Sequence, residues 1–152
     1  MILGVKVNSD MPGVPPPGAS PRSQPSGRTD STAPILVVDD DPGILAMLRD
    51  FLESEGLAVR TATNGAEALS ALGEVNPSLI LLDMRMPVLD GWAFASALRE
   101  RRLDYRIVVM TAAENAGRWA DEIGADGYIA KPFDVDELLR TIERHRRPPR
   151  PN

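Results

Sequence analysis

Hydrophobic and polar positions follow two different periods along the chain from residue 35 onward. Short apolar runs typical of strands occupy residues 35–38, 58–62, 79–82, 107–110 and 128–130. Between these runs, apolar residues recur at the spacing of one helix face. The stripes are Ile44, Leu45, Leu48, Phe51 and Leu52; Ala68, Leu69, Leu72 and Val75; Phe94, Ala95 and Leu98; Ala116, Trp119, Ala120 and Ile123; and Val135, Leu138, Leu139 and Ile142. The pattern predicts five strands alternating with five helices.

Polar residues at the expected starts of three helices support this prediction. Asp41 stands directly before a proline, which favours an N-cap with proline at the first helical position. Asn64 with Glu67, and Asp134 with Glu137, have capping-box spacing, with an Asx residue in place of Ser or Thr.

Regular alternation of strands and helices indicates an α/β fold, in which a parallel sheet is covered by helices on both faces. The runs at 79–82 and 107–110 are continuously apolar, as expected for central strands that are buried on both sides. The alternative, an α+β sandwich, would show a cleaner alternation of apolar and polar residues in those strands.

The two ends of the chain differ in composition from the middle. Residues 1–33 are rich in Pro, Ser and Gly, so we expect a disordered N-terminal tail. Residues 147–152 are basic and proline-rich, and we expect a short C-terminal tail there. The folded domain is expected over residues 34–146, without a further output domain, as in a stand-alone single-domain protein.

Composition limits the classes of function. The 152 residues include no cysteine, which excludes disulfides, thiolate metal ligands and a cysteine nucleophile and agrees with a reducing compartment. No apolar run approaches the ~20 residues of a membrane span, so the cytoplasm is the expected location and no membrane contact is expected. Residues 34–142 carry a net charge of about -9, which argues against direct DNA binding by this part.

Polar residues follow the predicted strands at the edge where open parallel sheets bind ligands. Asp39 and Asp40 follow the first strand, Asp83 the third, Thr111 the fourth and Lys131 the fifth. Crowded carboxylates need a neutralising cation, and oxygen ligands without His or Cys favour Mg²⁺. With the charge shielded, one aspartate can attack phosphorus and form an aspartyl phosphate, without an imidazole base.

Four segments, ILVVDDDP, LILLDMRMPVLDGWAF, VVMTA and GADGYIAKPF, together resemble the receiver domain of two-component response regulators. The resemblance covers roughly residues 34–146. It implies a flavodoxin-like (βα)5 doubly wound parallel sheet with strand order 2-1-3-4-5. It also implies Mg²⁺-dependent acceptance of a phosphoryl group from a phosphohistidine, on a sensor histidine kinase or a histidine phosphotransfer protein.

The resemblance implies a role for each residue of the acidic cluster. Asp83 is the implied phosphoacceptor. Asp40 and Asp83 are implied to ligate Mg²⁺ together with the backbone carbonyl of Arg85, and Asp39 is implied to act mainly through a coordinated water.

The other implied site residues respond to the phosphoryl group. Lys131 is implied to pair with the phosphoryl oxygens, and its bond to Pro132 is implied to be cis. Thr111 is implied to move its hydroxyl onto the phosphoryl group, while Tyr128 swings inward. Thr111 and Glu114 also have capping-box spacing, so we expect the hydroxyl to cap the fourth helix before phosphorylation.

The expected function is that of a phosphoacceptor in phosphorelay signal transduction. The protein is not expected to be an enzyme, and is expected to catalyse only its own phosphorylation and dephosphorylation. The output is expected to be a contact with an unidentified protein, through the face made by the fourth helix, fifth strand and fifth helix. Homodimerisation on phosphorylation stays open.

Two alternative functions remain. A receiver-like module that binds partners without phosphorylation would be expected to have lost an acid or the lysine, and this chain retains them. A Mg²⁺-dependent aspartyl phosphatase usually carries a second acid two residues after the nucleophile, and Arg85 stands there instead.

Overall fold

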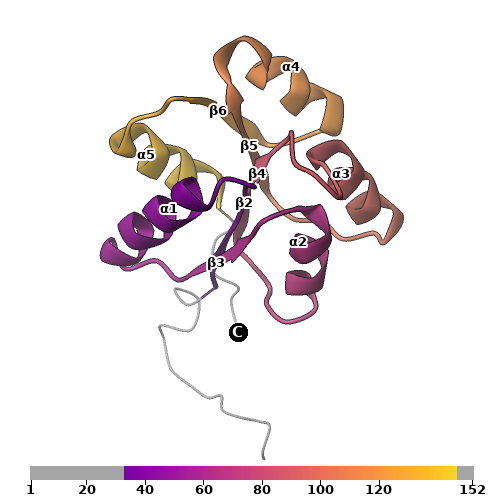
Figure 1. Cartoon of the computed structure of the whole chain (residues 1–152), viewed down its shortest axis with the longest axis horizontal. Coiled ribbons are helices and arrows are strands. Elements are labelled where there is room, and N and C mark those ends of the chain that lie inside the picture. The colour runs from indigo at the N-terminus through magenta and orange to yellow at the C-terminus, as the bar shows by residue number, and fades with distance from the viewer. Residues whose placement is uncertain (1–32, 147–152) are drawn as a thin grey trace, which may run out of the picture. The chain divides into compact units, whose positions relative to one another are not determined.

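A computed structural model describes residues 33–146, so the expected C-terminal tail and nearly all of the expected N-terminal tail lie outside the described residues. Figure 1 shows strands and helices that alternate along this part of the chain. They are β2 (Ile35–Val38), α1 (Pro42–Ser54), β3 (Val59–Ala62), α2 (Gly65–Leu72), β4 (Leu79–Asp83), α3 (Gly91–Glu100), β5 (Ile107–Ala112), α4 (Ala113–Ile123), β6 (Gly127–Lys131) and α5 (Val135–His145). None of the helices between residues 33 and 146 is both long enough and apolar enough to cross a bilayer.

The five strands form one parallel sheet in the order β3-β2-β4-β5-β6. Counted along the described chain, this order is 2-1-3-4-5, which confirms the implied topology. The chain first passes from β2 outward to β3 and then returns across β2 to β4. The direction of winding therefore reverses between β2 and β4, and ligands of open α/β sheets bind outside the carboxyl ends of strands at such a point.

Helices cover both faces of the sheet, with α1 and α5 on one side and α2, α3 and α4 on the other (Figure 1). Side chains of successive strand residues point to opposite faces and enter two separate apolar cores. Ile35 and Val37 of β2 pack towards α1 and α5, whereas Leu36 and Val38 pack towards the other helices. The predicted α/β fold is thus confirmed, and burial on both faces explains why the central strands are continuously apolar.

The three predicted helix caps are confirmed. The Asp41 carboxylate accepts hydrogen bonds from the backbone amides two and three residues further on, at 2.8 and 3.3 Å. Asn64 and Asp134 each accept one from the amide three residues further on, at 2.9 and 2.7 Å. Glu67 accepts a bond from the amide of Thr63 at 2.8 Å, one residue before the cap, and this bond lowers the pKa of the Glu67 carboxyl.

The expected capping role of Thr111 is wrong. β5 continues through Thr111 to Ala112, which is the N-cap of α4 and makes no side-chain cap hydrogen bond. Thr111 pairs in register with Ala130 of β6, so its backbone stays extended. Strand pairing therefore overrides the capping signal and leaves the Thr111 side chain at the end of the strand.

The second helix also ends earlier than its apolar stripe predicts. Gly73 is the C-cap of α2, so Val75 lies beyond the helix, although its backbone amide still bonds to the carbonyl of Ala71 at 2.9 Å.

Candidate functional site

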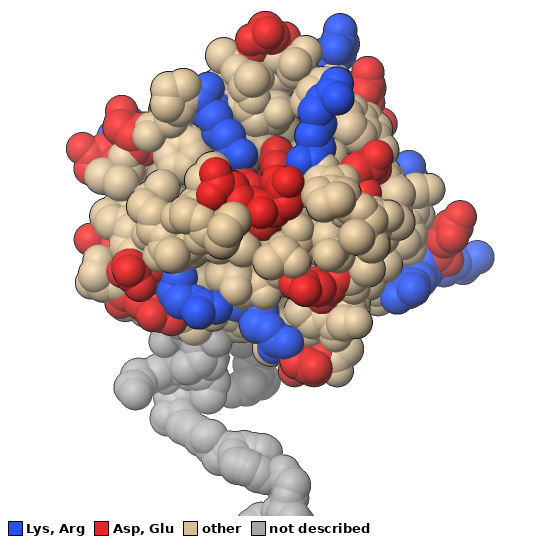
Figure 2. Space-filling model, viewed as in Figure 1, with Lys and Arg blue, Asp and Glu red and all other residues tan. Residues whose placement is uncertain are grey.

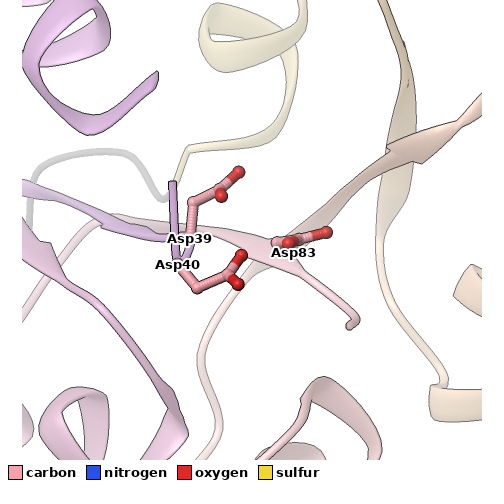
Figure 3. Close-up of side chains that lie close together, drawn as sticks. All are labelled: Asp39, Asp40 and Asp83. Atoms are coloured by element: carbon pink, nitrogen blue, oxygen red, sulfur yellow. The ribbon is translucent and has the colours of Figure 1, made fainter. Parts of the chain in front are cut away.

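Three aspartates converge at the point where the winding of the sheet reverses. Asp39 and Asp40 follow β2, and Asp83 is the last residue of the neighbouring strand β4. One carboxylate oxygen from each lies within 4.8 Å of the others. Figure 3 shows the three side chains reaching into the same space, and Figure 2 shows acidic side chains gathered at the centre of one face, with basic side chains along one margin. The structure thus brings these three predicted residues together.

Asp39 is buried, with a relative exposure of 1%, and both of its carboxylate oxygens have partners. Oδ2 accepts a hydrogen bond from Nζ of Lys131 at 2.7 Å, and Oδ1 accepts one from the backbone amide of Asp41 at 2.9 Å. The same Nζ lies 3.8 Å from Oδ1 of Asp83. Lys131, at the end of β6, therefore links the buried acid of one strand end to the acid of the next, and the peptide bond to Pro132 that follows it is cis, as the resemblance implies.

The negative charge of Asp83 is less well compensated by its neighbours than that of Asp39. Burial raises its pKa to about 6, and the negative charges of Asp39 and Asp40 add to the effect. The Lys131 ammonium and a hydrogen bond from the backbone of Met84 act in the opposite direction without restoring the ordinary value. Additional positive charge at this site would therefore favour the ionised form of Asp83.

The donor set fits a hard divalent cation. Three carboxylates and one ammonium leave a net charge of about -2, and the acidic cluster contains no His or Cys ligand. Oxygen donors of this kind suit Mg²⁺, which commonly binds through one or two carboxylates and keeps several waters. Because both oxygens of Asp39 are already engaged, Asp40 and Asp83 are the carboxylates best placed to hold the ion directly.

The two expected switch residues lie in different environments. Thr111 is buried, one residue before the end of β5, and pairs with the residue that precedes Lys131. Tyr128 of β6 is 55% exposed and lies against α4, where a Cβ added to Gly117 would be 3.5 Å from its ring. The structure thus places Thr111 at the strand edge that carries the acids and leaves Tyr128 on the outer surface.

Gly91, the first residue of α3, allows this helix to approach the end of β4. A Cβ at this position would lie 2.5 Å from Sδ of Met84, 2.8 Å from its Cα and 3.1 Å from the backbone oxygen of Asp83. The amide of Gly91 donates to the carbonyl of Met84 at 2.9 Å, and Asp90 caps the helix. The Asp-Gly pair in the sequence signals the turn, but the contact that requires glycine is visible only in the fold.

The loop between β4 and α3, which follows Asp83, contains a strained turn. Val88 has a φ of 72°, and the amide of Leu89 donates across it to the carbonyl of Pro87 at 2.8 Å. This is the pattern of a γ-turn with positive φ, which is rare, and a β-branched residue is especially unfavourable there. The carbonyl of Leu89 in turn accepts a bond from Gly65 of α2 at 2.9 Å, which anchors the loop.

Replacing Val88 by glycine is therefore expected to stabilise the protein by about 1 kcal/mol, because relief of roughly 1–2 kcal/mol of backbone strain exceeds the entropic cost of glycine. The valine side chain is 80% exposed, so little packing is lost. Urea unfolding measures the change. Arg102→Gly is the matched control, since Arg102 has a φ of 58° but no β-branch, and it should gain less. A loss of stability in Val88→Gly would contradict the assignment of strain.

Comparisons with known proteins give a matching family model and several similar proteins. The model of the family described as response regulator receiver domain matches residues 35–143. The chain is similar to the transcriptional regulatory protein PrrA of Mycobacterium tuberculosis, with 43% identity over 76% of this chain and 51% of PrrA. It is similar to the sporulation initiation phosphotransferase F of Bacillus subtilis, with 34% identity over 73% of this chain and 91% of that protein. The chain thus spans about half the length of PrrA and most of the second relative.

Among solved structures, the chain is similar to the response regulator protein TrrA of Thermotoga maritima in complex with Mg²⁺ and BeF, with 34% identity and a TM-score of 0.66. The match covers 74% of this chain and 98% of TrrA.

Proposed function

The chain belongs to the receiver-domain family of response regulators, and on this premise we propose that it accepts a phosphoryl group on Asp83 in Mg²⁺-dependent phosphorelay signalling. The observation that carries the proposal is the arrangement of Asp39, Asp40 and Asp83 around one space, with the ammonium of Lys131 2.7 Å from the first and 3.8 Å from the last. Negative charge on an incoming phosphoryl group would meet this ammonium, while the acids supply the nucleophile and the ligands of a cation.

The chemistry assigned to Asp83 is an in-line displacement at phosphorus. One carboxylate oxygen forms the P–O bond while the P–N bond to the imidazole of the donor histidine breaks; the electron pair of that bond stays on the ring nitrogen, which takes up a proton from water. Lys131 holds the phosphoryl oxygens, and Asp39 keeps Lys131 in place through the 2.7 Å hydrogen bond. When bound, Mg²⁺ supplies positive charge that offsets the carboxylates and the transferred group.

The proposed phosphoryl donor is a sensor histidine kinase or a histidine phosphotransfer protein, and the protein itself catalyses only its own phosphorylation and dephosphorylation. These donors are charged with phosphate from ATP, and we therefore propose a cytoplasmic location. Thr111 and Tyr128 are proposed to transmit the state of Asp83 to the face formed by α4, β6 and α5. The exposed ring of Tyr128 beside Gly117 supports this part of the proposal. A protein target, or a second copy of the chain, is proposed to bind there in preference to DNA.

The test is incubation with acetyl phosphate and Mg²⁺ followed by Phos-tag electrophoresis. We expect a retarded band for the wild type and none for Asp83→Asn, because an amide oxygen is a far weaker nucleophile than a carboxylate. Asp41→Asn is the control, since this neighbouring acid serves as a helix cap and asparagine caps equally well. A retarded band that persists in Asp83→Asn, or is absent from the wild type, would refute the proposal.

A further inference from the structure

Arg85 lies two residues beyond Asp83, and its guanidinium rests on an indole. The guanidinium carbon is 5.1 Å from the ring centroid of Trp119. None of the ion pairs within residues 33–146 involves Arg85. A cation at the margin of a site with three acids is therefore held by an aromatic face and is not neutralised by a carboxylate.

The backbone between Asp83 and residue 86 directs the Arg85 side chain away from the core. Met84 and Met86 are buried in the apolar core beneath α2, α3 and α4, whereas Arg85 between them is exposed. β4 ends at Asp83 and the chain bends at Met84, so the regular alternation of strand side chains does not continue into this loop. Arg85 therefore leaves the loop away from the core, two residues beyond Asp83, the group proposed to carry the phosphate.

Trp119 connects Arg85 to two helices. It belongs to α4 and is only 5% exposed. Its ring meets Trp92 of α3 edge to face, with centroids 4.9 Å apart and planes at 70°. Nε1 of Trp92 donates to the carboxylate of Glu122, which is again on α4, at 2.9 Å. The position of the Arg85 guanidinium is thus part of the packing between α3 and α4.

We propose that Arg85 is a positioning residue that couples the charge at Asp83 to α4 through Trp119. The proposal rests on the proposed phosphorylation of Asp83. In the unphosphorylated protein the guanidinium covers Trp119. After phosphorylation it turns to the phosphoryl oxygens and uncovers the indole.

The energetics favour this exchange of partners. A phosphoryl group adds about -1.5 to -2 charges and several strong acceptor oxygens. Arginine binds such a group through two parallel charge-assisted hydrogen bonds, which are stronger than a cation–π contact at an exposed site. Because the Arg85 side chain is exposed, it can reorient without opening a cavity. Each state of Asp83 thus has a different preferred partner for Arg85, which is the differential contact that a shift in population requires.

Fluorescence of Trp119 can report this movement directly. The full sequence has two tryptophans, so Trp92→Phe leaves Trp119 as the only one. Quenching by acrylamide is measured in this background, with and without beryllofluoride and Mg²⁺ as a stable phosphoryl mimic. We expect beryllofluoride to increase the Stern–Volmer constant about twofold, because the covering cation departs.

The Arg85 variants separate coupling from simple packing. In the Trp92→Phe background, Arg85→Ala should show a high quenching constant before the mimic is added and almost no further increase. Arg85→Lys, which keeps the charge, should restore part of the response. Arg118→Ala is the matched control and should retain the full response, because Arg118 lies on α4 but pairs with Asn115 and Glu122.

Parallel samples treated with acetyl phosphate and analysed by Phos-tag give the phosphorylated fraction of each variant. The inference is overturned if Arg85→Ala responds like its parent, or if Trp119 does not respond in a parent protein that is visibly phosphorylated. If no variant is phosphorylated, the proposed function itself has failed and the inference fails with it, which is a distinguishable result.

Discussion

The metal-free protein is expected to become more stable at about pH 7.5 when Asp83 is replaced by asparagine, by about 2–3 kcal/mol. The cause is the folded environment, which raises the pKa of the Asp83 carboxyl from 3.8 to about 6 through burial and through the charges of Asp39 and Asp40. Folding therefore forces an ionised carboxylate into a site that disfavours it, and each pKa unit corresponds to about 1.4 kcal/mol. Asparagine has a similar shape without the charge.

The effect has a definite direction with pH. Between the unfolded pKa near 3.8 and the folded pKa near 6, the folded state binds more protons than the unfolded state. The free energy of unfolding therefore falls as pH rises through this window. Below about pH 3 the carboxyl is protonated in both states and the penalty is absent, whereas above about pH 6 it is almost fully present. The stabilisation by Asp83→Asn should accordingly grow from near zero at about pH 3 to its full size at neutral pH.

Urea unfolding in EDTA over this pH range measures the difference between wild type and Asp83→Asn. Asp41→Asn serves as the control, because Asp41 is an exposed cap outside the cluster and its replacement should give no comparable gain. Mg²⁺ at about a hundredfold excess over its Kd should stabilise the wild type by about 2.7 kcal/mol and the variant by less. Equal stability of the two metal-free proteins at neutral pH would show that the cluster does not disfavour the charge of Asp83.

The sequence predicts the scaffold of the site because its signals are local. Apolar runs mark the strands, and Asx residues mark three helix starts. Residues that directly follow parallel strands lie together at one edge of the sheet. Asp39 and Asp83 could thus be placed at one edge without coordinates, since both immediately follow continuous apolar runs. The parallel sheet confirms that edge, with β2 and β4 as direct neighbours.

Other features depend on contacts between segments distant in the sequence. Thr111 carries a capping signal, yet pairing of β5 with β6 keeps it extended. The positive φ of Val88 is not signalled, because valine is a residue that disfavours such a conformation. The contact of Arg85 with Trp119 joins residues 34 positions apart. No local signal in the sequence predicts that these two side chains meet. The periodicity of apolar residues identifies the strands and helices, whereas these features arise from tertiary contacts between them.

Replacing Lys131 by alanine is expected to destabilise the protein by about 3 kcal/mol, because it leaves a charge buried without its counterion. Asp39 is 1% exposed, and its Oδ2 depends on Nζ of Lys131 at 2.7 Å. The exposed pair between Arg60 and Glu74 is the matched control, since Arg60→Ala should cost less than about 1 kcal/mol. The contrast separates burial of a charge from the mere presence of an ion pair.

The double variant Asp39→Asn/Lys131→Met decides whether the loss arises from the unpaired carboxylate. Removing both charges eliminates the buried ion, so the double variant should recover most of the stability lost in the single variant Lys131→Met. Urea unfolding of Asp39→Asn, Lys131→Met and the double variant gives a coupling free energy, expected to exceed about 1 kcal/mol for groups in direct contact. A coupling near zero would mean that Lys131 contributes through its aliphatic chain alone. The ammonium would then be free of a structural role, and its placement beside Asp83 would have to be explained by phosphoryl binding alone.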